Sequence, residues 1–248
     1  MKIKSYLILI LSLISFSCKK PEDRQCYKGR GEDISTEMSI EGIESATLGR
    51  NIKFVLIQDS TEKVVVKTGK NLINFLKISF VNKHLEISNN NKCNYLRYNK
   101  NEVLVELHIK SIRRIYYKGS EPLTNVDTLS WGSFSLISND NAAIIDLNVQ
   151  MDSLYFSNPY AWPIVNLKGI CNFCQINIEG DAKMNLRNLK VCNTFNYESE
   201  SSQFGEINLQ NTLKFVGQLR GNGDVGYRND PIEIFTSNYG KGIFRKLN

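Results

Sequence analysis

Six cysteines are the residues of this chain best suited to chemistry. Cys171 and Cys174 enclose two residues, a spacing typical of redox-active pairs and of one half of a zinc site. A zinc site also needs a second pair of ligands at a matching spacing. Only Cys192 lies nearby, and the two histidines, His84 and His108, are distant in the sequence. We therefore predict no metal and no cofactor, and we interpret these cysteines as core residues or disulfide partners whose state stays open.

Cys18 stands where a lipid anchor is expected. A basic start at residues 1–4 precedes an apolar run, Tyr6–Phe16, that is too short to cross a bilayer of about 30 Å but has the length of a secretory signal core. The small residue before Cys18 resembles a lipobox. We predict a lipoprotein signal peptide over residues 1–17, diacylated Cys18 as the first mature residue, and a charged tether over residues 18–25. An ordinary signal peptide with a chance cysteine is the alternative.

Export also bears on the other cysteines, because disulfides persist in oxidising compartments. With Cys18 assigned to lipid, five cysteines remain, so at least one thiol stays free. Cys26 and Cys93 both lie in the N-terminal half, and we predict that they form a disulfide.

The composition argues against a nucleic-acid partner. The formal net charge is +6, but charges of both signs are interspersed, and no basic stripe with interleaved aromatic residues is present. Hydrophobic residues make up 42% of the chain, which is ordinary for a folded protein. The only membrane contact that the sequence requires is the N-terminal lipid.

The elements that would position these residues are predicted to be strands, because short runs alternate between apolar and polar residues and helical periodicity is almost absent. In the N-terminal part we predict two hairpins, residues 52–57 with 63–67 and residues 77–81 with 84–88. The intervening residues 71–76 are compatible with a single helical turn. The protein is therefore predicted to be all-β.

A regular repeat begins near residue 123. A segment that reads apolar, Asp or Asn, Leu, polar occurs at residues 145–148, 165–168, 184–187 and 207–210. This recurrence is typical of a β-solenoid, in which stacked coils about 4.8 Å apart would place Leu147, Leu167, Leu186 and Leu209 in one inward column. Each buried leucine contributes about 1.5–3 kcal/mol.

Two further columns follow from the same repeat. The residues before each Asp or Asn, at 145, 165, 184 and 207, would form a second inward column, and Asp146, Asn166, Asn185 and Asn208 would point outward as an amide ladder. Chance alternation in a β-sandwich is the alternative.

The C-terminal motifs resemble the end of DUF2807, the family described as putative auto-transporter adhesin, head GIN domain. These are residues 216–225 (VGQLRGNGDV), 228–231 (RNDP) and 239–247 (YGKGIFRKL), and residues 43–66 look like that family's opening strands. The resemblance covers about residues 26–248.

This resemblance implies a right-handed parallel β-helix-like solenoid with a hairpin-containing N-terminal portion, about residues 26–122, followed by repeats over about 123–248. It also implies the envelope of Gram-negative bacteria, with an outer-membrane lipoprotein facing the periplasm or the surface. We interpret Gly221 and Gly223 as a corner that needs positive φ rather than a phosphate cradle, since no helix follows them.

We predict a non-catalytic cell-envelope lipoprotein, an adhesin-like or structural binding module for a glycan or an envelope protein. The candidate ligand contacts are the exposed aromatic residues Tyr155, Tyr160 and Trp162, with Tyr160 and Trp162 the main candidates. The competing interpretation is that the loop over residues 158–163 folds back on the coil. A polysaccharide-acting β-helix enzyme is one alternative, but its paired carboxylates, about 5–9.5 Å apart, are not evident, because Asp146 is the only acid in its row. An envelope stress or sensing component is the other.

Overall fold

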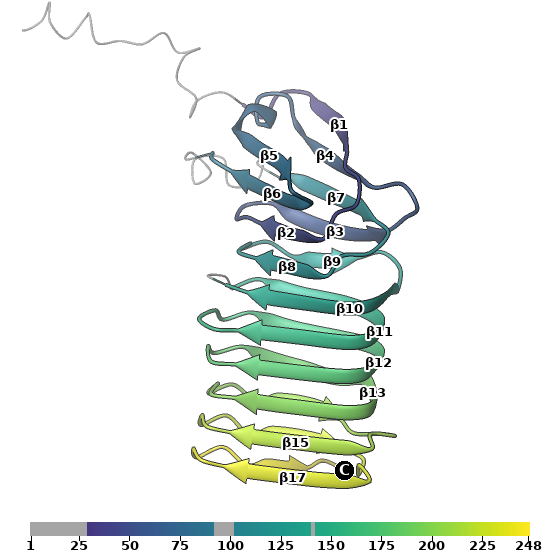
Figure 1. Cartoon of the computed structure of the whole chain (residues 1–248). Coiled ribbons are helices and arrows are strands. Elements are labelled where there is room, and N and C mark those ends of the chain that lie inside the picture. The colour runs from purple at the N-terminus through teal and green to yellow at the C-terminus, as the bar shows by residue number, and fades with distance from the viewer. Residues whose placement is uncertain (1–28, 92–101, 140–141) are drawn as a thin grey trace, which may run out of the picture.

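The computed structural model describes residues 29–91, 102–139 and 142–248, and these form a parallel β-solenoid (Figure 1). The predicted lipidation site Cys18 and the predicted disulfide partners Cys26 and Cys93 lie outside the described residues. No helix in the described part is long and apolar enough to cross a bilayer.

The strands of the N-terminal part are short. They are β1 (Asp33–Ser39), β2 (Ser45–Leu48), β3 (Lys53–Gln58), β4 (Lys63–Gly69), β5 (Leu76–Val81), β6 (His84–Asn89) and β7 (Leu104–Ile109). The predicted helical turn is the 3-10 helix η2 (Ile73–Phe75).

The strands of the repeats lengthen toward the middle of the stack. They are β8 (Arg114–Tyr117), β9 (Leu123–Asn125), β10 (Leu129–Ser138), β11 (Ile144–Asn158), β12 (Ile164–Ile178), β13 (Lys183–Ser199), β14 (Gly205–Asn208), β15 (Lys214–Leu219), β16 (Val225–Arg228), β17 (Glu233–Asn238) and β18 (Phe244–Lys246).

Parallel pairing arranges these strands in two long faces. Face A stacks β6, β2, β8, the C-terminal parts of β10 to β13, β15 and β17. Face B stacks β7, β3, β9, the N-terminal parts of β11 to β13, β14, β16 and β18. From β8 and β9 onward, each step to the next strand advances by one coil, so residues one repeat apart in the sequence become neighbours.

Antiparallel strands cover the N-terminal end. The second predicted hairpin is confirmed as β5 and β6, and Asn82 and Lys83 at its turn have φ of 50° and 61°, as a type I′ turn requires.

The first predicted hairpin is wrong. Strand β7 lies between β3 and β4, with Glu106 opposite Val55 in parallel and opposite Val65 in antiparallel register. Strand β7 buries every second side chain, and it hydrogen-bonds to β3 along one backbone edge. Only its other backbone edge is then available to pair with β4.

The interior confirms most of the predicted columns. Ile145, Val165 and Met184 are aligned and buried, and so are Leu147 and Leu167. The place of Leu209 in the column is wrong, because Leu186 lies opposite Ile207. Leu209 therefore falls beyond the column, just after the end of β14, although it is buried there. Because Ile207 lies opposite Leu186, it is not in the column of Met184 either.

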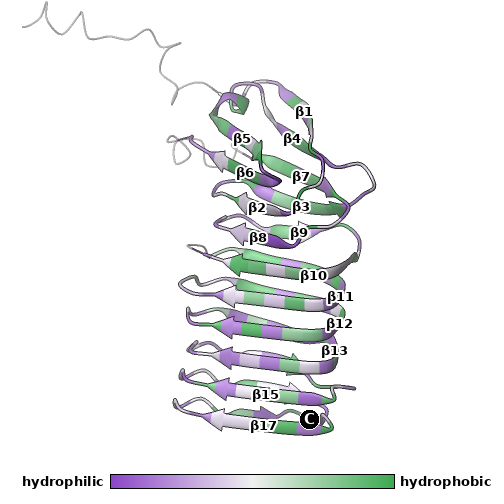
Figure 2. Ribbon diagram, in the orientation of Figure 1, coloured by the Kyte–Doolittle hydropathy of each residue, from purple (hydrophilic) through white to green (hydrophobic). Residues whose placement is uncertain are grey.

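The outward row agrees only in part with the predicted ladder. Nδ2 of Asn185 donates to Oδ1 of Asn166 over 3.1 Å, which is one rung between neighbouring coils. Glu206, rather than Asn208, takes the next place in the row. Figure 2 shows the underlying alternation of hydrophobic and hydrophilic residues along β11 and β12.

Glycine is required at residues 221 and 223 for a different reason from the one predicted. Neither Gly221 nor Gly223 has positive φ. Instead, a Cβ on Gly221 would lie 2.2 Å from the carbonyl oxygen of Glu200, and one on Gly223 would lie 2.2 Å from that of Gln203. These glycines therefore permit the close approach of stacked turns, which no residue with a side chain allows.

Aromatic rings fill the C-terminal part of the interior. The ring centroids of Phe195 and Phe215 are 5.6 Å apart, as are those of Phe215 and Phe244, and both pairs meet edge to face. Such contacts add about 0.5–1.5 kcal/mol per pair to the area that they bury. Phe244 on β18 thus helps to close the last coil.

Candidate functional site

The cysteine pair lies in the core. Cys171 and Cys174 of β12 are buried free thiols, and Cys192 is a partly buried free thiol. Burial, together with a hydrogen bond that the Cys174 thiol donates to Cys171, raises the pKa of Cys174 well above its ordinary value. A buried neutral thiol is a poor nucleophile and a poor metal ligand. Among the described residues, no group of three or more His, Cys, Asp or Glu side chains could hold a metal ion.

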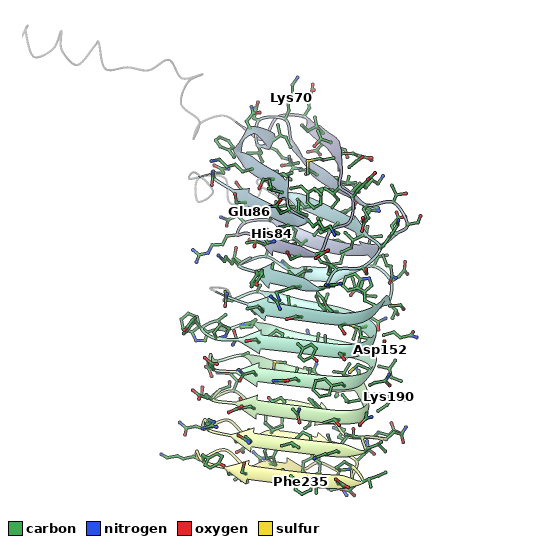
Figure 3. All side chains as sticks on the ribbon, in the orientation of Figure 1. Lys70, His84, Glu86, Asp152, Lys190 and Phe235 are labelled. Carbon is green, nitrogen blue, oxygen red and sulfur yellow. The ribbon has the colours of Figure 1, made fainter. Side chains whose placement is uncertain are left out.

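The two histidines are held by local partners. The ring nitrogens of His84, which Figure 3 labels on β6, lie 2.7 Å from Oγ of Ser45 and 3.1 Å from Oγ1 of Thr47. Nδ1 of His108 lies 3.0 Å from Oδ2 of Asp59. The histidines belong to separate clusters, each of which ties neighbouring segments together.

The acids in the repeat do not form a close pair. Asp146 contacts Nζ of Lys168 at 3.4 Å. The next acid in its row is Glu206, three coils away, which corresponds to about 14 Å at about 4.8 Å per coil. Glu206 is also bound by Arg228 at 2.9 Å. This row does not meet the spacing of a glycosidase pair.

Asp181, in the turn after β12, binds the next turn of the stack. Its Oδ1 accepts hydrogen bonds from the hydroxyl of Ser201 at 3.0 Å and from the backbone N–H of Ser202 at 2.6 Å, and its Oδ2 accepts one from Gln203 at 3.0 Å. Burial opposes ionisation, but these hydrogen bonds outweigh it and lower the pKa of Asp181 to about 2. The carboxylate is a structural clamp between two turns.

Two of the three predicted ligand contacts lie on a fixed loop. Tyr160 and Trp162 are 76% and 67% exposed. The loop backbone is held by buried Asn158, whose Nδ2 donates to the carbonyl of Ala161 over 3.0 Å and whose Oδ1 accepts from its N–H over 3.1 Å. The N–H of Asp181 in the next coil also donates to the carbonyl of Ala161. The loop is thus tied to the coil while both aromatic rings face solvent.

A second feature, a hollow of about 600 Å³, opens on face A. Its floor is β10, whose outward residues there are small: Gly132, Ser133 and Ser135. Ser135 lies between Arg114 of β8 and Tyr155 of β11 in the stack. Two large side chains therefore flank a small one, and the missing volume is the hollow. Figure 1 shows these three strands as successive steps of the stack.

The wall on the β8 side carries two arginines. Arg113 and Arg114 both line the hollow. The Arg114 guanidinium lies 5.9 Å from the centre of the Tyr116 ring and donates to the Tyr116 hydroxyl over 3.2 Å. Among the residues that the structure describes, neither arginine is in an ion pair with a carboxylate. By contrast, carboxylate partners hold Arg30, Arg187, Arg220, Arg228 and Arg245.

Glu44, an acid that interacts with Arg113, already has another partner. Nζ of Lys83 binds Oε1 of Glu44 at 2.7 Å. The pKa of Glu44 is lowered mainly by this lysine, and the attraction of Arg113 is the smallest contribution. The charge of Arg113 is therefore only weakly compensated.

The remaining wall is aromatic. Tyr155 is 40% exposed, and its ring centre is 5.5 Å from that of Phe173 in the next coil. Trp131 is 5% exposed and packs edge to face on Phe134 at 5.2 Å. The buried Nε1 of Trp131 has no hydrogen-bond partner among the described residues, which is uncommon for a buried donor.

The family model for DUF2807, described as putative auto-transporter adhesin, head GIN domain, matches residues 44–231. The chain belongs to the DUF2807 family. The resemblance noted in the sequence is thereby confirmed, and the matched region includes β8, β10 and β11, which form the hollow. No curated protein matches this DUF2807 chain.

Solved structures share the fold of the DUF2807 protein at low sequence identity. A putative adhesin from Bacteroides fragilis is 13% identical, with a TM-score of 0.75 over 87% of this chain and 97% of its own. A putative adhesin from Parabacteroides merdae is 16% identical, with a TM-score of 0.62 over 89% and 98%. A putative lipid binding protein from Parabacteroides distasonis is 14% identical, with a TM-score of 0.64 over 89% and 98%.

Sequence reasoning found the exposed loop of the DUF2807 protein and Tyr155 as a candidate contact, but it missed the hollow that Tyr155 lines. The signal was present, because Arg114, Ser135 and Tyr155 follow one another at intervals close to the spacing of the leucine repeat. Extending that period upstream of residue 123 would have placed the three side chains in one outward column.

Proposed function

We propose that this DUF2807 protein is a non-catalytic cell-envelope module that is anchored through lipid on Cys18 and binds an extended partner, a glycan or an envelope protein, in an adhesin-like role. Membership of a family described as adhesins and the similarly named structural relatives support this role.

The observation that carries the proposal is the presentation of Tyr160 and Trp162. Large aromatic side chains are costly to leave in water and are enriched where proteins bind partners. Here the loop is tied at Asn158 and Ala161, so little backbone entropy would be lost on binding. Two rings held in solvent on a rigid loop fit a contact surface better than they fit a purely structural rod.

The anchor is supported by the order of segments along the chain. The apolar run before Cys18 and the charged residues after it are typical of a bacterial lipoprotein. Two or three acyl chains hold a protein firmly at a bilayer, since each buried methylene contributes about 0.8 kcal/mol.

Binding can be tested by exposing the mature protein, displayed on beads, to a panel of bacterial and host glycans and to isolated envelopes. The double variant Tyr160→Ser/Trp162→Ser is expected to reduce retention on at least one surface by about tenfold or more, as loss of interface aromatic residues does. Phe235→Ser/Tyr239→Ser is the matched control, since these rings are 55% and 68% exposed on the last coil. Figure 3 labels Phe235 there. Equal loss in both variants, or no retention on any surface, would contradict the proposal.

A further inference from the structure

We infer that the hollow between β8, β10 and β11 is a binding site for an acidic saccharide, with Arg114 and Arg113 receiving its carboxylate and Tyr155 receiving the face of a sugar ring. This inference rests on the proposed function, because it names the class of partner that the envelope module would bind. It concerns a different surface from the loop of Tyr160 and Trp162.

The arginines offer a binding point for an anion. Arg113 and Arg114 both line the hollow, and in the described part of the chain neither is in an ion pair with a carboxylate, whereas five other arginines are. Arg114 is braced by Tyr116, which fixes the guanidinium against the wall. Guanidinium groups bind planar carboxylates through two parallel hydrogen bonds, and a braced arginine loses less entropy in forming them.

The rest of the hollow suits a ring that carries hydroxyl groups. Ser133 and Ser135 on the floor can donate and accept hydrogen bonds. Tyr155 lies two strands from Arg114, so their backbones are about 10 Å apart, enough for one sugar ring with its carboxylate toward the arginine. The half-exposed ring of Tyr155, supported by Phe173, offers a flat surface for the apolar C–H groups of a pyranose.

The volume of the hollow and the unsatisfied N–H donor of Trp131 are both consistent with a bound small molecule. The volume of about 600 Å³ lies within the range of about 300–1,000 Å³ that is usual for small-molecule sites. Nε1 of Trp131 is buried in the wall without an acceptor among the described residues. We assign the missing acceptor to an oxygen of the bound saccharide. The indole N–H of Trp131 would reach that oxygen after a small movement of the side chains around it.

The test uses Trp131 as the reporter. The chain has two tryptophans, so in the Trp162→Phe variant the indole fluorescence comes from Trp131 alone. Trigalacturonic acid is titrated into the mature protein, and its fully methyl-esterified form, which has the same rings without charge, is the matched ligand control. We expect a saturable change in Trp131 emission with the acid and none with the ester.

Variants then locate the site. Arg114→Gln is expected to weaken binding of the acid by about tenfold, the effect of losing one charged hydrogen-bonding group, while Arg220→Gln, on a paired arginine, leaves it unchanged. Ser135→Tyr fills the hollow and should abolish the response, whereas Val216→Tyr, at the same outward position lower in the column, should not. Circular dichroism confirms that each variant is folded.

Several outcomes would overturn the inference. These are an equal response to the methyl ester, a response that Arg114→Gln leaves intact, no response to the acid, or saturation by inorganic phosphate at lower concentration than by the acid. If the protein fails here yet is still retained on envelopes through Tyr160 and Trp162, the saccharide site is wrong and the proposed function stands. Binding only to an envelope protein, lost in Arg114→Gln, would reassign the hollow to an acidic protein segment and also overturn the inference.

Discussion

Gly240 lies directly beneath Gly221 in the stack of turns, so close that a Cβ on Gly240 would meet the carbonyl oxygen of Gly221 at 2.1 Å. The N–H of Gly242 donates to that same carbonyl over 3.1 Å. The spacing between turns is therefore set by backbone contact alone, and side chains at these positions would push the coils apart.

Replacing Gly240 with alanine is expected to lower the free energy of unfolding by about 1–3 kcal/mol, since the added methyl group must displace backbone. Urea unfolding followed by circular dichroism would measure this loss. Gly132→Ala is the control, because its nearest contact would be 4.0 Å from the new Cβ and its φ is not positive. Equal loss in both variants would show that the close approach of the turns is not the cause.

Asp181 is expected to make stability depend on pH in the acid range. Its pKa is about 2 in the folded protein and 3.8 in the reference state. A lowered folded-state pKa means that the stabilisation is complete above about pH 4 and disappears as the pH falls toward 2. Asp181→Ala should therefore cost about 2 kcal/mol near neutral pH, as lost charged hydrogen bonds do, and progressively less between pH 4 and pH 2.

The same unfolding series on Asp152→Ala provides the comparison for Asp181. Asp152, labelled at the corner of the stack in Figure 3, accepts one hydrogen bond of 3.3 Å from Asn172 and is exposed. Its replacement should change stability by less than about 0.5 kcal/mol, as surface substitutions usually do. A constant penalty for Asp181→Ala over the whole acid range would contradict the clamp.

Cys171 and Cys174 should resist alkylation in the folded protein. Both thiols are buried, and the raised pKa of Cys174 disfavours its thiolate. With iodoacetamide at neutral pH and peptide mass spectrometry, partly exposed Cys192 is expected to be modified first. Rapid labelling of Cys171 or Cys174 before unfolding would indicate a reactive pair instead.

Lipidation at Cys18 remains a prediction from the sequence. Cells expressing the full chain and fed a clickable palmitate analogue should label the wild-type protein and not Cys18→Ser, and globomycin should cause the precursor to accumulate. Cys26→Ser is the control, as it should keep the lipid while losing the predicted disulfide with Cys93. Export of an unlabelled, cleaved protein would favour an ordinary signal peptide.

The sequence was informative where the period was regular. Leu147 and Leu167 could be aligned because a single coil without irregularity separates them. Leu209 was placed wrongly, since Leu186 lies opposite Ile207 and the four-residue pattern at 207–210 is therefore displaced by two residues from the column. A periodic pattern identifies repeats but does not locate such displacements.

Strand order was harder to predict than strand position. The coil formed by β2 and β3 lies between the one formed by β6 and β7 and the one formed by β8 and β9. Neighbouring segments such as β3 and β4 looked like a hairpin because both alternate, yet the burial of β7 decides the pairing. The hollow was missed for a related reason: it arises from the sizes of Arg114, Ser135 and Tyr155 in three different coils.

If Cys18 carries the predicted lipid, the position of the hollow within the stack sets its distance from the anchored end of the solenoid. The carbonyl of Gly29, the first described residue, accepts a hydrogen bond from Asn71 at the end covered by antiparallel strands, so a lipid attached upstream would make that end the base. Strand β10 is then three steps from β6, about 14 Å, whereas β17 is a further five steps, about 24 Å, outward. A saccharide held at β10 would therefore lie nearer the anchored end than the free end, and the outer coils would extend beyond it, away from the lipid.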